Sequence, residues 1–159
     1  MLFENDKIFS IFKKNNKLLH SDNFIGNLNE ILKVNNFSLS DLDNVYFISG
    51  SGGWTGYRVS ISFLTAMSIL SKVKFFSIDS LSFQKGKIKN CLSVIKNNSR
   101  NYLLNHYEND VLIFTDNFLN LEQINAFNRK NLPIFVDLNN IDFVENFFFL
   151  KNKFNEFEI

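Results

Sequence analysis

A cluster of glycines in the first half of the chain constrains the fold more than any other stretch. Four of the six glycines in the 159 residues lie between Gly50 and Gly56. They separate the apolar run Val45–Ile48 from the longer run Val59–Val73. Glycine tolerates positive φ and lets another backbone approach closely, so the cluster predicts a tight turn from a strand into a helix. This turn fixes where the following helix points.

A glycine-rich loop that opens a helix can also bind phosphate, because free N–H groups and the helix dipole favour anions there. The residues of this loop fit the known phosphate motifs poorly. The dinucleotide fingerprint requires its third glycine at Thr55, and a P-loop requires a Gly-Lys-Ser/Thr ending that is absent. Ser51 does not fit a nucleophile elbow, since Ser49 rather than glycine stands two residues before it. A structural turn is therefore favoured over a nucleotide site.

The same loop resembles the Gly-Pro-Gly-Ser-Phe-Thr-Gly-x-Arg signature of the TsaB family, a subunit of the bacterial tRNA threonylcarbamoyladenosine synthase. The identical positions are Gly50, Gly52, Thr55, Gly56 and Arg58. Trp54 keeps the aromatic character of the family's Phe, whereas Ser51 and Gly53 replace its Pro and Ser. We interpret these residues together as a structural glycine turn.

A second stretch resembles the family's His-Ser-Glu-x-Leu-Leu-Pro-x-Ile pattern. His20 and Ser21 match it, and conservative matches follow at Asp22, Phe24, Ile25 and Leu28. Ser21 or Asp22 can cap a helix over 22–32, whose apolar residues recur at helical spacing. Gly26 replaces the family's Pro and costs about 1 kcal/mol relative to alanine, so this helix depends on packing.

The N-terminal segment predicts a hairpin. Lys7–Phe12 is its first arm, Lys13–Lys17 its turn and Leu18–Leu19 its second arm. TsaB-like chains begin with an additional strand, for which only Met1–Asn5 is available here.

Apolar runs predict the remaining elements. Strands are expected at Val45–Ser49, Val73–Ile78, Ile88–Ile95, Tyr102–Tyr107, Val111–Phe114 and Pro133–Val136, and helices at Tyr57–Leu70, Leu121–Arg129 and Asp142–Ile159. The helical material that the family has between Leu81 and Ile88 is expected to be missing. The alternation of predicted strands with predicted helices indicates an α/β domain. The resemblance implies one shortened domain with the actin-like ATPase (ASKHA, ribonuclease-H-like) fold, its first lobe about 1–85 and its reduced second lobe about 86–159.

Composition narrows the class of protein. With 45% hydrophobic and 21% charged residues the chain is globular, and a net charge of +1 gives no electrostatic reason for autonomous nucleic-acid binding. No apolar run is long enough to span a bilayer, and the acidic start does not fit a secretory signal. A single cysteine cannot form an internal disulfide. We expect a cytoplasmic protein that does not contact a membrane.

The residues offer little catalytic chemistry. His20 and His106 lack metal-ligand spacing, and Cys91 in a predicted strand is expected to be a small buried hydrophobe. Solvated loop acids are expected at Asp41, Asp43, Asp79 and Asp116. Arg58 stands at a helix start, where a cation is unfavourable, so we expect it to have a carboxylate or carbonyl partner. We therefore predict no catalytic residue, no metal and no cofactor.

The resemblance implies a non-catalytic subunit that binds TsaD, the related subunit that transfers the threonylcarbamoyl group to the adenosine beside the tRNA anticodon. The ATPase subunit TsaE is a further candidate partner, and tRNA would be contacted only through the complex. If the helices over 22–32 and 57–70 lie side by side, their outward apolar faces would pair with an equivalent helix pair of the partner. The predicted interface residues are Phe24, Leu28, Ile31, Phe63 and Met67.

Two alternatives stay open. The first is a stand-alone nucleotide-binding or peptidase-like enzyme of the actin-like superfamily, with Ser51 or the glycine loop as its site. The second is a self-associating structural homodimer that uses the same helices without TsaD.

Overall fold

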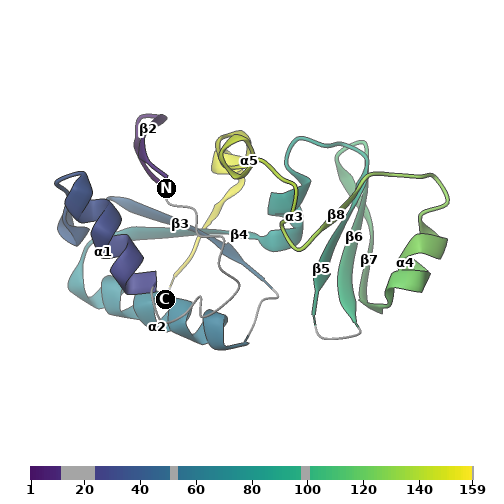
Figure 1. Cartoon of the computed structure of the whole chain (residues 1–159), viewed down its shortest axis with the longest axis horizontal. Helices are drawn as coiled ribbons and strands as arrows, with labels where there is room; N and C mark the ends of the chain where they lie inside the picture. Colours follow the sequence, from purple (N-terminus) through teal and green to yellow (C-terminus); the bar gives the residue numbers. More distant parts are fainter. Residues whose placement is uncertain (12–23, 51–53, 98–100, 159) are drawn as a thin grey trace. The chain divides into compact units, whose positions relative to one another are not determined.

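The computed structural model describes residues 1–11, 24–50, 54–97 and 101–158 (Figure 1). The chain divides into two compact units. The first unit comprises Met1–Val45, Gly53–Phe75 and Glu156–Ile159, and the second comprises Tyr46–Gly52 and Phe76–Asn155. Each unit contains both helices and strands, in agreement with the predicted mixed α/β content.

The first unit begins with a hairpin formed by β1 (Leu2–Glu4) and β2 (Lys7–Ser10), which pair antiparallel. Asn5 and Asp6 join them with φ values of 46° and 66°. Two successive residues with positive φ match the right-handed twist of the strands they connect. The predicted strand from Lys7 is confirmed, and its hairpin partner is β1. The predicted turn and second arm at 13–19 lie outside the described residues.

Two helices of the first unit each turn one face inward. In α1 (Phe24–Val34), Leu32 is buried while Gly26, Glu30 and Lys33 are exposed. In α2 (Trp54–Leu70), Leu64 and Met67 are buried, whereas the opposite face carries exposed side chains. The exposed residues of that opposite face are Ser62, Ala66 and Ile69. Both predicted helices are confirmed, and α2 begins three residues before the predicted start at Tyr57.

A three-stranded sheet has the order β3-β4-β9. Its strands are β3 (Asn44–Ser49), β4 (Lys74–Asp79) and β9 (Asn155–Glu156). Beside β9, the N–H of Phe157 donates to the carbonyl of Phe75 at 2.8 Å. The prediction of one helix over Asp142–Ile159 is therefore wrong beyond Leu150, because pairing with β4 overrides the local helical pattern.

The second unit is built on a four-stranded sheet of order β7-β6-β5-β8. Its strands are β5 (Cys91–Lys96), β6 (Tyr102–Glu108), β7 (Val111–Leu119) and β8 (Ile134–Val136). The pairs β5–β6 and β6–β7 are antiparallel, whereas β8 runs parallel to β5. A parallel return needs a crossover, which α4 (Leu121–Phe127) supplies. The predicted strands of this half are confirmed.

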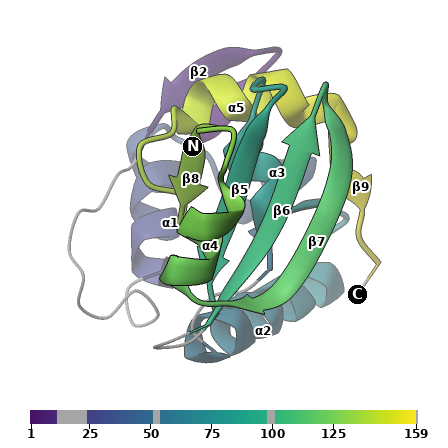
Figure 2. The same cartoon turned by 90° about the vertical axis from the view of Figure 1, so that its right-hand side faces the viewer.

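Helices cover both faces of this sheet, with α4 on one side and α3 (Ser80–Lys85) on the other (Figures 1 and 2). On the α4 side, Ile124 joins a buried cluster completed by Leu92, Val94, Tyr102 and Leu104. On the other side, Ser93 donates a hydrogen bond to the carbonyl of Leu81 at 2.6 Å. Two-sided coverage explains why every residue from Cys91 to Ile95 is buried.

The helix α3 corrects the expectation that helical material is missing between Leu81 and Ile88. Asp79 caps it by accepting a hydrogen bond from the N–H of Ser82 at 2.9 Å. The helix α5 (Phe143–Leu150) packs beside it, with the rings of Phe83 and Phe143 4.9 Å apart. Among the described residues, none of the helices combines the length and the apolar character that a transmembrane helix requires.

Candidate functional site

The predicted strand–turn–helix arrangement around the glycine cluster is confirmed at its two ends. Gly50 follows β3 with φ of 132°, and a Cβ placed on it would lie 2.4 Å from Ser80 Oγ. Only glycine allows this close approach between the end of β3 and the start of α3. Trp54, Thr55 and Gly56 open α2, while Ser51, Gly52 and Gly53 lie outside the described residues. Arg58 is exposed on the early turns of α2.

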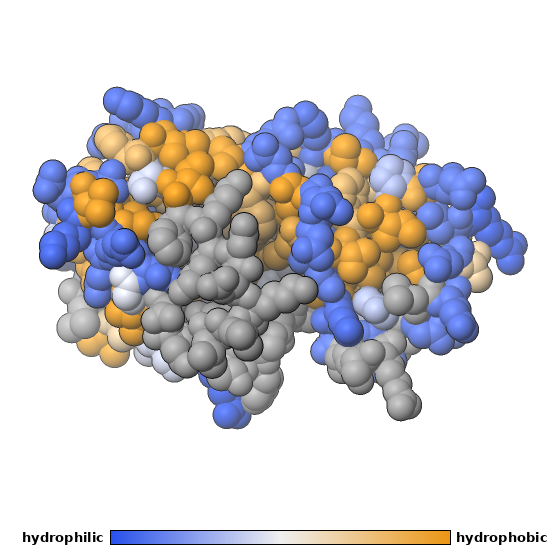
Figure 3. Space-filling model, in the orientation of Figure 1, coloured by the Kyte–Doolittle hydropathy of each residue, from blue (hydrophilic) through white to orange (hydrophobic). Residues whose placement is uncertain are grey.

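The residues predicted to bind a partner differ in burial. Leu28, Ile31 and Phe63 are half-buried, whereas Met67 is only 4% exposed and belongs to the interior of the first unit. Phe24 begins α1, but its side chain lies outside the described part. The most exposed apolar side chains of these helices are Ile25, Val34 and Ile69. On the face in Figure 3, apolar surface occurs in several areas separated by hydrophilic side chains. The interface itself stays a prediction.

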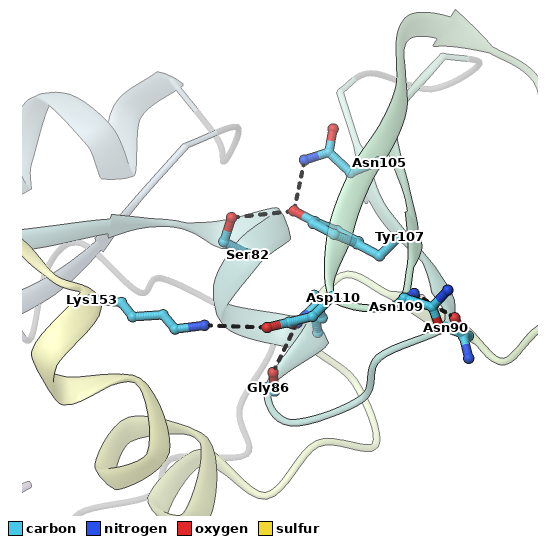
Figure 4. A network of polar contacts seen from close by, with 9 residues as sticks. Ser82, Gly86, Asn90, Asn105, Tyr107, Asn109, Asp110 and Lys153 are labelled. Carbon is cyan, nitrogen blue, oxygen red and sulfur yellow. Dashed lines mark hydrogen bonds and ion pairs between the residues drawn. The ribbon is translucent and has the colours of Figure 1, made fainter.

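A polar network in the second unit links α3 to the β6–β7 turn (Figure 4). The buried ammonium group of Lys85 forms an ion pair with Asp110 and lies 5.3 Å from the centroid of the Tyr107 ring. Lys153 approaches the other Asp110 oxygen at 3.7 Å. The hydrogen bond from Lys85, with a smaller contribution from Lys153, holds the pKa of Asp110 below its ordinary value. This arrangement neutralises a buried cation, which is otherwise strongly unfavourable.

A chain of hydroxyl and amide groups continues from this ion pair along the sheet. Tyr107 Oη lies 3.2 Å from Ser82 Oγ and accepts a hydrogen bond from Asn105 Nδ2 at 3.0 Å (Figure 4). Thr115 Oγ1 in turn donates to Asn105 Oδ1 at 3.0 Å. These groups satisfy one another, so the network fixes α3 on the sheet.

Cys91 is fully buried beside this network, as predicted for a small hydrophobe. Burial raises the pKa of its thiol to about 11, an effect that Lys85 opposes and Asp110 reinforces. The thiolate is the reactive form of cysteine, so Cys91 is protonated and inert at neutral pH.

Two titratable residues singled out in the sequence, His106 and Asp41, have polar neighbours in the structure. His106 Nε2 lies 3.3 Å from Glu108 Oε1, and Lys130, which pairs with Glu108, lowers the pKa of that carboxyl group. Hydrogen bonds from Ser38 lower the pKa of Asp41. Within 1–11, 24–50, 54–97 and 101–158, no three His, Cys, Asp or Glu side chains gather as metal ligands would. His20 lies outside these ranges.

The sequence analysis missed the buried side chain of Gln84, whose amide group contacts several partners. Its amide nitrogen lies within hydrogen-bonding distance of three acceptors, namely Ser93 Oγ at 2.7 Å, the Val94 carbonyl at 3.0 Å and the Phe135 carbonyl at 3.1 Å. Its Oε1 accepts from the N–H of Leu138 at 2.9 Å. Gln84 thereby joins α3 to β5 and β8, and nothing in a six-residue segment signals contacts so distant in sequence.

Replacing Asp110 with asparagine is expected to lower the free energy of unfolding by about 2 kcal/mol. The change leaves the Lys85 ammonium group buried without its carboxylate, which costs about 3–5 kcal/mol in a fully buried pair. The Asp110 side chain is 45% exposed, and solvent screening reduces that cost. Urea unfolding at pH 7 measures the difference.

The pH dependence gives a second readout of the same pair. Because the folded pKa of Asp110 is lowered, its stabilisation is complete above the unfolded value near 3.8 and is lost as pH falls through the folded pKa. Asp43→Asn, at an exposed position, serves as the control and should change stability little. If Asp110→Asn and Asp43→Asn lowered the free energy of unfolding equally, the role of the ion pair would be contradicted.

Comparison with known proteins bears on the fold. No protein-family model and no curated protein matches the chain. The structure is similar to YeaZ from Pseudomonas aeruginosa, a TsaB protein, with a TM-score of 0.51 and 13% sequence identity over 64% of this chain. The chain has a distantly TsaB-like fold. It covers 53% of the YeaZ chain, about half of its length. The likeness shows the fold alone.

Proposed function

We propose that this chain is a non-catalytic subunit that binds TsaD and supports threonylcarbamoylation of the adenosine next to the tRNA anticodon. The observation that carries the proposal is the position of the TsaB-like motif in a TsaB-like fold. Gly50 follows β3 at positive φ and α2 opens with Trp54, Thr55 and Gly56, so the described ends of the motif lie between a strand and a helix. The fold likeness alone would not support a function.

We propose further that the chain acts by binding and not by its own chemistry, within a shortened actin-like fold. The buried ammonium group of Lys85 is engaged in an ion pair with Asp110. Cys91, the single cysteine, has a raised pKa that keeps it protonated. These observations support a subunit whose contribution lies on its surface.

The helices α1 and α2 are the proposed surface for TsaD. On the outward face of α2, the small residues Ser62 and Ala66 precede Ile69, whose side chain is 77% exposed. Small side chains let another helix approach closely, and an exposed isoleucine gives it an apolar contact. The half-buried Leu28 and Phe63 are proposed to lie at the margin of this contact.

Replacing Ile69 with glutamate is expected to weaken TsaD binding at least thirtyfold, since a large interface side chain contributes about 2 kcal/mol or more. The exposed position leaves the fold intact, which circular dichroism verifies. Isothermal titration with TsaD of the same organism measures affinity, and a reconstituted assay with TsaD, TsaE and tRNA measures modification.

The matched control is Ile113→Glu, because Ile113 is also an exposed isoleucine, 57% accessible, on β7 of the second unit. It should bind TsaD normally. Full activity of TsaD without this chain would refute the proposed function. Loss of binding by Ile113→Glu together with normal binding by Ile69→Glu would place the interface on the second unit. Tight ATP binding or turnover by the isolated chain would favour the enzyme alternative.

A further inference from the structure

We draw no further inference here: the strongest candidate, the exposed apolar segment 111–114 of β7 at one end of the four-stranded sheet, carries none, because nothing in the described part of the structure shows what covers it.

Discussion

Replacing Gln84 with methionine is expected to lower the free energy of unfolding by about 3 kcal/mol. Methionine has nearly the same length, so packing around this 1% exposed position is kept while the hydrogen bonds are lost. The Phe135 carbonyl and the Leu138 N–H then lose their bonds to the Gln84 amide. Each buried polar group left without a partner costs about 1–3 kcal/mol. Ser93 Oγ keeps its hydrogen bond to the Leu81 carbonyl, and this limits the total loss of stability.

The control for this prediction is Gln123→Met. Gln123 is exposed on α4, where its side chain accepts a hydrogen bond from the N–H of Asn120 at 3.2 Å. Losing this half of a capping box should cost less than about 1 kcal/mol. Urea unfolding of both variants gives the comparison. Similar losses would mean that Gln84 does not connect α3 to the sheet as described.

Replacing Gly86 with alanine is expected to destabilise the chain by a similar amount, about 3 kcal/mol. Gly86 ends α3 with φ of 54° and ψ of −129°, a conformation that is costly for any residue with a Cβ. The added carbon would also lie 2.1 Å from Asn146 Oδ1. Asn146 is buried and donates to the Phe83 carbonyl at 3.0 Å, so moving it breaks a second contact.

Replacing Gly26 with alanine is expected to have the opposite effect and to stabilise the chain. Gly26 lies within α1, and a Cβ placed there would meet no other atom within 4 Å. Alanine should therefore stabilise the helix by up to about 1 kcal/mol. Thermal unfolding followed by circular dichroism measures both variants. Destabilisation by Gly26→Ala, or a neutral Gly86→Ala, would contradict this account.

Local sequence predicted the parts of the fold that depend on local chemistry. The alternation of apolar runs with turns placed β5, β6 and β8. The signal is clear in β5, where every residue from Cys91 to Ile95 is buried because helices cover both faces of the sheet. Gly50 marked the turn after β3, because only glycine fits its positive φ and close contact.

Other features depend on contacts distant in sequence and could not be predicted. The helix α3 has six residues, too few for a periodic pattern. The end of the chain forms β9 because β4 offers it a pairing edge, although Phe143, Phe147, Leu150 and Phe154 suggested a continued helix. The ion pair between Lys85 and Asp110 joins residues 25 positions apart. The inward position of Met67 follows from how α2 packs, which an apolar helix pattern alone does not determine.

The strand order β3-β4-β9 has a consequence for synthesis on the ribosome. A nascent chain emerges from its N-terminus, so β3 and β4 leave the exit tunnel early. The edge of β4 that β9 occupies stays open until Asn155 and Glu156 are translated. By then all four strands of the sheet β7-β6-β5-β8 have already emerged. Three of them, β5, β6 and β7, follow one another in the chain and pair in that order. The sheet of β3, β4 and β9 therefore begins before the four-stranded sheet and is completed after it. The open edge of β4 is the one that a nascent-chain chaperone would need to protect.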